Sequence, residues 1–139
     1  MSALVADMRQ ADRDECAAAG ALDLDGAVRG GVRTSALCWT ATVDGEVAAI
    51  FGVVPVSLLG DDGVVWMLGT PLVARNARSL MRIFRPYLGL MLKAYPHLLN
   101  YVHARNRTAL GWLRRTGFTL GAPVAAATGE MFYPFEMRA

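Results

Sequence analysis

The sequence predicts one α/β (α+β) domain over residues 1–139, because strand-like and helix-like patterns follow one another without a linker, repeat or low-complexity stretch. Three strand-like segments separated by tight turns predict an antiparallel meander, and a long amphipathic helix follows them. Hydrophobic residues make up 54% of the chain and charged residues 19%, which supplies one core and argues against a disordered tail.

The N-terminal third predicts a short strand and two helices. Residues 4–9 have a strand-like pattern. Asp12 can cap a helix that runs to about residue 19, where Gly20 is a natural stop. A second short helix is expected over residues 24–35, although Gly30 and Gly31 weaken it.

The meander is the clearest part of the pattern. Residues 37–43 are rich in aromatic and β-branched types, and Asp44-Gly45 is a typical hairpin turn. A second strand is expected over residues 47–56 and a third, almost wholly apolar, over residues 64–69, with a Gly- and Asp-containing turn between them.

The longest helix is expected after this meander. Apolar residues recur at three- and four-residue steps from Leu80 to Tyr95, so they share one face. The opposite face carries the basic residues Arg78, Arg82, Arg85 and Lys93. Pro96 ends the helix.

The C-terminal third alternates again between strands and a helix. Residues 98–102 predict a buried strand, and Asn106 can cap a helix through residue 115 that closes at Gly117. Final strands are expected over residues 118–120 and 131–137, separated by a loop rich in Gly, Pro and Ala. The aromatic ending, residues 132–135, would suit a homodimer or partner contact.

Composition excludes several classes of function. The net charge is only +2, although thirteen arginines accompany a single lysine, so we do not expect nucleic-acid binding. No apolar run is long enough to span a membrane, and the N-terminus lacks the pattern of a secretory signal, so a cytoplasmic location is expected. Cys16 and Cys38 have no metal-site spacing, and we expect no metal.

The segment Asn106 to Phe118 resembles the N-x-x-A…G-F motif of the GNAT acetyltransferases, with Ala109 and Gly117 at the matching places. The order of predicted elements is similar to that family over nearly the whole chain. The resemblance implies a mixed, mostly antiparallel central sheet that splays into a V-shaped cleft, with about four helices packed on it. It also implies that acetyl-CoA lies in the cleft, pairing with an open strand edge, and that the acceptor is an amine of a small molecule or protein.

A narrower resemblance joins four segments, residues 66–70, 95–102, 104–106 and 135–137, to a phage-encoded GNAT-like family labelled internal virion protein A-like. It implies a phage-encoded protein in the host cytoplasm or associated with the virion. A virion protein or a host protein would then be a partner.

The resemblance places cofactor-binding residues in three groups. The strand before the cleft contributes Met67, Leu68, Gly69 and Thr70, the phosphate region contributes Arg75, Asn76, Ala77 and Arg78, and the motif helix contributes Asn106 and Leu113. Asn106 would either cap its helix or cap it and also meet the pantetheine. Thr70-Pro71 can alternatively begin the long helix earlier, which would change the amides that face the ligand.

Two departures from the family pattern bear on catalysis. The family's phosphate loop reads Q/R-x-x-G-x-G/A, but residues 72–80 contain no glycine, so Arg75, Asn76 and Arg78 would have to attract the phosphates instead. Leu113 stands where many members carry the tyrosine that protonates the departing thiolate.

His103 follows the second strand of the cleft and is the predicted general base, the alternative being a surface loop histidine. Two functions follow: an N-acetyltransferase, or a non-catalytic GNAT-fold protein of virion assembly or host-factor binding. Trp39, Trp66 and Trp112 are expected in the core rather than on a base-stacking surface.

Overall fold

A computed structural model describes residues 8–18 and 24–139 of the chain. The helices are α2 (Gln10–Ala18), α3 (Leu24–Thr34), α4 (Leu72–Arg75), α5 (Ala77–Ala94) and α6 (Arg107–Thr116). The strands are β1 (Leu37–Val43), β2 (Glu46–Pro55), β3 (Asp62–Gly69), β4 (His97–His103), β5 (Thr119–Leu120), β6 (Val124–Ala125) and β7 (Met131–Arg138).

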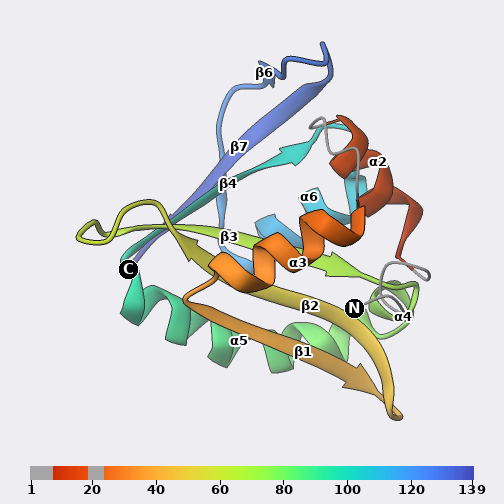
Figure 1. Cartoon of the computed structure of the whole chain (residues 1–139). Helices are drawn as coiled ribbons and strands as arrows, with labels where there is room; N and C mark the ends of the chain where they lie inside the picture. The colour runs from red at the N-terminus through yellow and green to blue at the C-terminus, as the bar shows by residue number, and fades with distance from the viewer. Residues whose placement is uncertain (1–7, 19–23) are drawn as a thin grey trace.

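The strands form one mixed sheet in the order β1-β2-β3-β4-β7-β5, with β6 also paired to β7. All neighbours are antiparallel except β3 and β4, which run parallel because the α4–α5 segment carries the chain back between them. Helices α2 and α3 lie in front of this sheet, whereas α5 and α6 lie behind and below it (Figure 1). From β3 the arm formed by β4 and β7 diverges, so the sheet opens into a V. The predicted splayed α/β architecture is therefore confirmed.

The three-strand meander forms as the sequence predicts. Its first turn places Asp44 at φ 51° and Gly45 at φ 82°, the left-handed conformations that an Asp-Gly hairpin turn requires. The register then runs from Leu37 opposite Val53 to Val43 opposite Glu46, with one irregularity between Ala41 and Thr42.

Both faces of the sheet are covered by apolar packing. The larger cluster joins the sheet to α5 and α6, and the smaller one places Val28 of α3 on Ile50 of β2. Trp39 and Trp66 pack against these two clusters, and Trp112 packs against a third, so all three tryptophans lie at apolar clusters, as predicted. The third cluster consists of Ala48, Ala49, Val73 and Leu80. The large cluster consists of Phe51, Val53, Val65, Leu88, Met91, Leu98, Val102, Leu110, Phe118 and Phe135.

The long helix is interrupted near its start. Pro71 is the N-cap residue of the short helix α4, and Asn76, at φ −121° and ψ 27°, separates it from α5. The helical segment thus starts at Leu72, one residue later than the Thr70-Pro71 alternative places it. A Cβ on Gly69 would lie 2.6 Å from Cγ2 of Val73, so α4 can approach this strand end only because a glycine is there.

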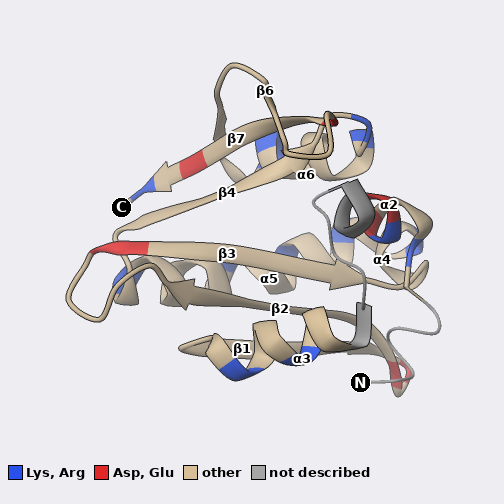
Figure 2. Cartoon of the chain, turned by 45° about the horizontal axis from the view of Figure 1, so that its top comes forward, with Lys and Arg blue, Asp and Glu red and all other residues tan. Residues whose placement is uncertain are grey.

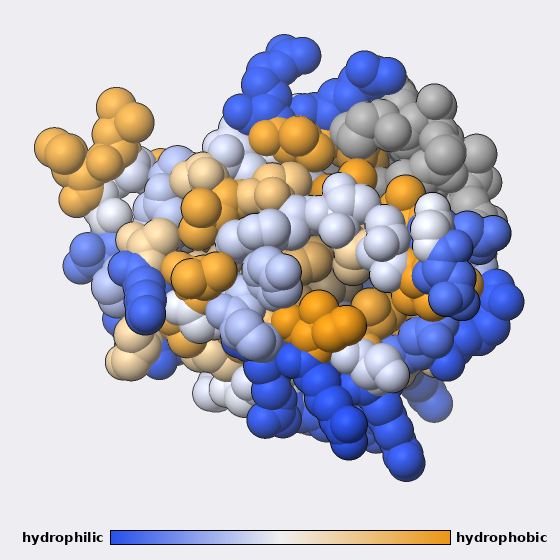
Figure 3. Space-filling model, turned by 90° about the horizontal axis from the view of Figure 1, so that it is seen from below, coloured by the Kyte–Doolittle hydropathy of each residue, from blue (hydrophilic) through white to orange (hydrophobic). Residues whose placement is uncertain are grey.

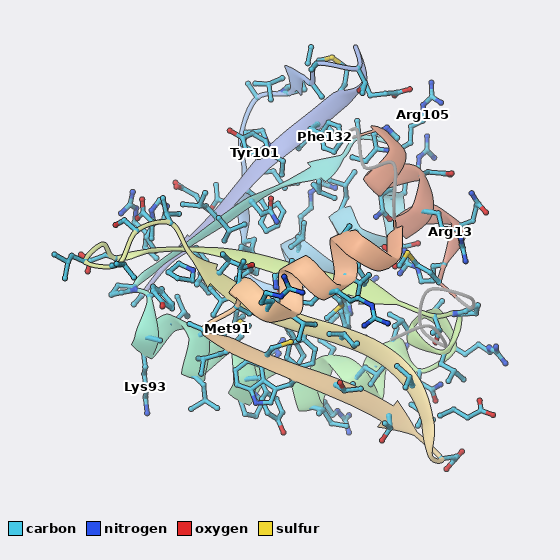
Figure 4. All side chains as sticks on the ribbon, in the orientation of Figure 1. Arg13, Met91, Lys93, Tyr101, Arg105 and Phe132 are labelled. Carbon is cyan, nitrogen blue, oxygen red and sulfur yellow. The ribbon has the colours of Figure 1, made fainter. Side chains whose placement is uncertain are left out.

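The basic side of α5 faces away from the sheet. Arg78, Arg82, Arg85 and Lys93 are all exposed, and the side chain of Lys93 points away from the ribbon of the sheet (Figure 4). Seen from below, hydrophilic residues are interspersed with apolar ones (Figure 3). Helix α5 also carries the exposed apolar residues Ile83 and Leu90.

The β2–β3 loop protrudes beyond the sheet and ends in an apolar tip. Leu58 and Leu59 are 97% and 100% exposed. The loop extends beyond the sheet in Figure 1, and Figure 3 shows an apolar protrusion at one end of the molecule. Within residues 8–18 and 24–139, no helix has the length and apolar character needed to cross a membrane.

The remaining predictions are partly corrected. Residues 4–7 of the predicted first strand lie outside the described part of the chain, and Met8 and Arg9 are not in a strand. Asp12 is not a helix cap, because α2 begins at Gln10 and the Asp12 carboxylate accepts a bond from Gly69 instead. The loop before the last strand contains the short strand β6, which pairs with β7.

Helix α6 is capped as predicted. The side-chain oxygen of Asn106 accepts from the backbone N–H of Ala109 at 3.3 Å, and Gly117 closes the helix at φ 103°.

Candidate functional site

The parallel pairing of β3 with β4 is short. Only three residues of each strand are in register, from Asp62 opposite His97 to Val64 opposite Leu99. Beyond Val64 the two strands separate, and this separation forms the gap of the V (Figure 1).

A side-chain amide occupies the first position beyond the paired region. The N–H of His97 donates to the carbonyl of Asp61, so the same offset would next bring the N–H of Tyr101 to the carbonyl of Val65. The amide of Asn100 is inserted there instead: its Nδ2 donates to the carbonyl of Val65, and its Oδ1 accepts from the N–H of Tyr101 at 2.7 Å. Both backbone groups are therefore satisfied although the strands have parted.

Among the described residues, the edge of β3 that faces the gap has partners at both ends and none between them. The carbonyl of Val65 binds Asn100, whereas the N–H and carbonyl of Gly69 bind Asp12 and Arg9 of the N-terminal segment. Along an antiparallel strand, alternate residues direct their backbone groups to the same side. Met67 lies midway between these two residues, so its N–H and C=O point into the gap.

The gap contains a cavity of about 200 Å³ with mostly apolar walls. The strands contribute Val65, Trp66, Met67, Leu68, Gly69, Asn100, Tyr101, Val102 and Phe135; α4 and α5 contribute Val73, Phe84 and Met91; α6 and its flanks contribute Asn106, Ala109, Trp112, Leu113, Thr116 and Phe118; and Arg9 and Asp12 come from the N-terminal segment and α2.

A polar network crosses the open end of this gap. Asp12 Oδ2 accepts from the N–H of Gly69 at 2.9 Å and lies 3.7 Å from Nε of Arg9, whose Nη2 reaches Asn106 Oδ1 at 3.4 Å. The network therefore joins the end of β3 to the start of α6 through residues near the N-terminus. Burial raises the pKa of the Asp12 carboxyl, and the Arg9 charge and the Gly69 hydrogen bond partly oppose that rise.

Two buried donors beside the cavity have no partner within the described part of the chain. They are Nδ2 of Asn106, a residue only 3% exposed, and Nε1 of Trp112, whose ring stacks on Phe84 with centroids 5.7 Å apart. An unpaired buried donor costs about 1–3 kcal/mol, so both positions favour a ligand with acceptor atoms.

The predicted cofactor-binding residues divide into two groups. Met67, Leu68, Gly69, Asn106 and Leu113 line the cavity. The other five, Thr70, Arg75, Asn76, Ala77 and Arg78, lie outside its lining.

The predicted phosphate region lies on the α4–α5 segment. Thr70 is buried, with its hydroxyl bonded to the carbonyl of Val47, whereas Arg75 and Arg78 are exposed. The amide of Asn76 donates to the carbonyl of Leu72 and thereby fills the break between the two helices.

His103 does not line the cavity. Its side chain is buried, with Nε2 3.1 Å from a carboxylate oxygen of Glu130 and its ring 5.3 Å from that of Phe132, the residue opposite it on β7. Phe132 and Tyr101 lie on the same arm in Figure 4. His103 is thus not a surface loop histidine, and its predicted role as a base stays a prediction.

The other end of the gap carries a second charged cluster. His97 Nδ1 lies 2.8 Å from Asp62 and its Nε2 lies 2.7 Å from Glu136, so one ring links β3, β4 and β7. Figure 2 shows acidic segments at the start of β3 and near the end of β7. The hydrogen bonds to Glu136 and Asp62 raise the pKa of His97, because only the protonated ring can donate to both carboxylates.

Sequence reasoning missed Arg9, Asp12, Asn100 and Trp112 as site residues. The contacts that bring Asp12 and Arg9 to the site span 57 and 97 residues. Asn100 was the one with a visible signal, a polar residue inside an apolar strand pattern. The described residues contain no group of three or more His, Cys, Asp or Glu side chains that could hold a metal ion.

No protein-family model and no curated protein matches the chain. Solved structures are similar to it. A putative phosphinothricin N-acetyltransferase has a TM-score of 0.67 and 13% identity, over 92% of this chain and 88% of that one. A spermidine N-acetyltransferase from Vibrio cholerae has a TM-score of 0.64 and 7% identity, over 83% and 73%.

A GNAT-family acetyltransferase from Streptococcus pneumoniae has a TM-score of 0.60 and 14% identity; the match covers 73% of this chain and 66% of that one. At identities this low, the similarity is evidence of a shared fold alone. The strand order, the gap between β3 and β4 and these likenesses together show that the chain has the fold of the GNAT acetyltransferases.

Proposed function

We propose that the chain is an N-acetyltransferase that binds acetyl-CoA in the cavity between β3 and β4 and transfers the acetyl group to an amine. The observation that carries this proposal is the open strand edge at Met67, which faces an apolar cavity between the diverging strands. An amide-bearing ligand can pair with such an edge as an added strand would.

The residues beside the cavity fit the pantetheine arm of acetyl-CoA. Its amide N–H groups need a backbone acceptor, which the carbonyl of Met67 offers, and its carbonyl oxygens are acceptors for the unpaired Asn106 Nδ2 and Trp112 Nε1. Met67, Leu68 and Gly69 would form one wall, with Asn106 and Leu113 opposite. When bound, acetyl-CoA supplies an activated thioester.

The phosphates would be held at the α4–α5 segment. Leu80 is the first residue of α5 whose N–H bonds back to Asn76, so the amides of Ala77 and Arg78 remain for an anion at a helix N-terminus. Arg75 and Arg78 supply guanidinium groups in place of the family's glycines, and Thr70 and Asn76 hold the segment to its neighbours.

The chain's own groups favour slow transfer. Leu113 lines the cavity at the place of the family's acid, and a leucine cannot donate a proton. The loss of a general acid costs about 10²–10⁴ in rate, but a thiolate with an ordinary pKa near 8.5 can leave unassisted. The backbone N–H of Met67 can stabilise the acyl oxygen as it gains charge.

The second candidate is a non-catalytic GNAT-fold protein that binds a virion or host partner. Leu113 and the glycine-free residues 72–80 favour it, and so does the fully exposed apolar tip at Leu58 and Leu59. The sequence resemblance to the phage-encoded branch would fit this role, and a contact through the C-terminal strand would fit a homodimer.

Calorimetry with CoA and acetyl-CoA, followed by thiol release over a panel of amines, tests the proposal. We expect both ligands to bind and to raise the melting temperature, because a ligand selective for the folded state stabilises it. The variant Leu113→Tyr should accelerate thiol release. Binding without thiol release for any amine would favour the second candidate, and no binding at millimolar CoA would contradict the cleft assignment.

A further inference from the structure

We propose that Asp12 is the group that accepts the proton of the acceptor amine in this cavity. The inference rests on the proposed acetyltransferase function and assigns a residue that neither the motif nor the family pattern points to. Its basis is the position of the Asp12 carboxylate at the open end of β3.

Asp12 is the only carboxylate among the described residues that line the cavity, and no histidine lines it. Of the other polar lining groups, Arg9 is permanently charged, and Asn100, Asn106, Thr116 and Trp112 cannot act as bases near neutral pH. Tyr101 is 53% exposed, so its hydroxyl is not held in a buried site as the Asp12 carboxylate is.

The carboxylate is held in one orientation with one oxygen available. Oδ2 takes the N–H of Gly69 and faces Arg9, whereas Oδ1 has no hydrogen bond to the described residues. Asp12 is 6% exposed, and the carboxyl's raised pKa follows from that burial. A carboxylate in this environment is a stronger base than an exposed one.

The spacing along β3 brings Asp12 within reach of the reacting atoms. Met67 and Gly69 are two residues apart, so their N–H groups lie about 7 Å from each other along the strand. With the acyl oxygen at Met67 N–H, an amine nitrogen about 3–3.5 Å from the acyl carbon lies between these two amides. Asp12 Oδ1 can take its proton directly or through one water.

The step balances with the groups present. The nitrogen of a neutral amine forms a bond to the acyl carbon while the carbon–sulfur bond breaks. The sulfur leaves as the thiolate with the electron pair, and the proton on nitrogen passes to Oδ1 of Asp12.

The pairing of Asp12→Asn with Asp14→Asn tests this role. An asparagine side chain at the first position keeps an acceptor for Gly69 N–H but cannot take a proton. Asp14 is exposed on the same helix and accepts a bond from Gln10 at 2.7 Å. We expect D12N to lower kcat/KM for thiol release about 10²–10⁴-fold and to remove the acid limb of the pH profile. We expect D14N to match wild type, D12E to recover part of the rate, and CoA affinity to stay unchanged in all three.

A second measurement is independent of turnover. Carbon-13 NMR of the aspartate carboxyls in the ligand-free protein, assigned with D12N or D12E, should show Asp12 titrating above the ordinary value of 3.8. Arg9 lies beside it, Arg13 and Asp14 are on the same helix, and Tyr101 lines the same cavity. His103 is on β4, a strand that α2 contacts, so H103A belongs in both series.

The outcomes separate the two proposals. Wild-type rate and pH profile in D12N, loss of rate in H103A alone, or an Asp12 carboxyl that titrates at or below 3.8 would overturn the role of Asp12. Wild-type protein that binds no CoA and releases no thiol would overturn the acetyltransferase proposal, and this one with it.

Discussion

The two ends of the β3–β4 gap are joined by different kinds of contact. At the apex, a backbone ladder, the fully buried Leu98 and the His97 cluster connect β3, β4 and β7. At the open end no strand pairing remains, and the connection among the described residues runs through the side chains of Asp12, Arg9 and Asn106.

The apex of the gap has the features of a stabilising core, whereas the open end has the features of a binding site. The apex satisfies its polar groups and fills its space, whereas the open end keeps a buried carboxylate, an unpaired amide and a cavity. Unpaired buried groups lower stability unless a ligand meets them. We therefore expect substitutions at the apex to act on unfolding and those near the open end to act on ligand binding or turnover.

The largest effect is expected for Leu98→Ala at the apex. Leu98 is completely buried in the large cluster, so the lost contacts and the remaining cavity should lower the free energy of unfolding by about 2–5 kcal/mol. Leu99→Ala, at the next position on the opposite face and only half-buried, should cost less. Denaturant unfolding measures both, and equal losses would contradict the assignment of the apex core to the Leu98 face.

Arg75→Ala and Arg78→Ala test the phosphate end of the site. Each should weaken CoA binding by about 1–3 kcal/mol, the range for hydrogen bonds to charged groups, and leave unfolding nearly unchanged because both side chains are exposed. Arg85→Ala, exposed further along α5, is the matched control. Calorimetry that gives the same CoA affinity for all three variants and wild type would rule this arrangement out.

Two substitutions of Asn106 distinguish the helix-capping role of its Oδ1 from the ligand-binding role of its unpaired Nδ2. Asn106→Ala removes the acceptor for Ala109 N–H and should cost about 0.5–2 kcal/mol in unfolding. Asn106→Asp keeps that acceptor but loses Nδ2, so it should unfold like wild type and still bind CoA more weakly. If Asn106→Asp binds CoA as tightly as wild type, the amide has no part in the site.

The smallest effect is expected at His97. Its pKa is raised in the folded state, so the stabilisation is fully present below the unfolded value of about 6.5 and is lost as pH rises through the folded value. Because Asp62 and Glu136 are about half exposed, the cluster belongs to the class of pairs worth about 0–1 kcal/mol. Melting temperatures of wild type and His97→Gln should therefore differ more at pH 6 than at pH 9, and a constant difference would count against the cluster.

Much of the fold could be predicted because its signals are local. The Asp44-Gly45 turn fixes the first hairpin, and the Asn106 and Gly117 caps fix α6, so these boundaries fall within one or two residues of the prediction. The break at Asn76 left no clear mark, because the residues on both sides favour a helix.

The sequence predicted only two parts of the candidate site, the residues of β3 and those of the motif at α6. Met67 to Gly69 and Asn106 follow from the order of elements and a short motif. Asp12 gave a misleading local signal, since an aspartate near a helix start usually caps it, whereas here a strand end 57 residues away takes the carboxylate. Such contacts depend on how α2 packs, which a local pattern does not encode.

The inserted amide of Asn100 ends the backbone hydrogen-bond ladder between β3 and β4. It replaces one backbone rung with two side-chain bonds, so the ladder ends at no cost in unpaired groups. Replaced by valine, the position would have no amide to insert, and the N–H of Tyr101 could close directly onto the carbonyl of Val65. Asn100 therefore marks the point at which backbone pairing between β3 and β4 ends and the cleft begins.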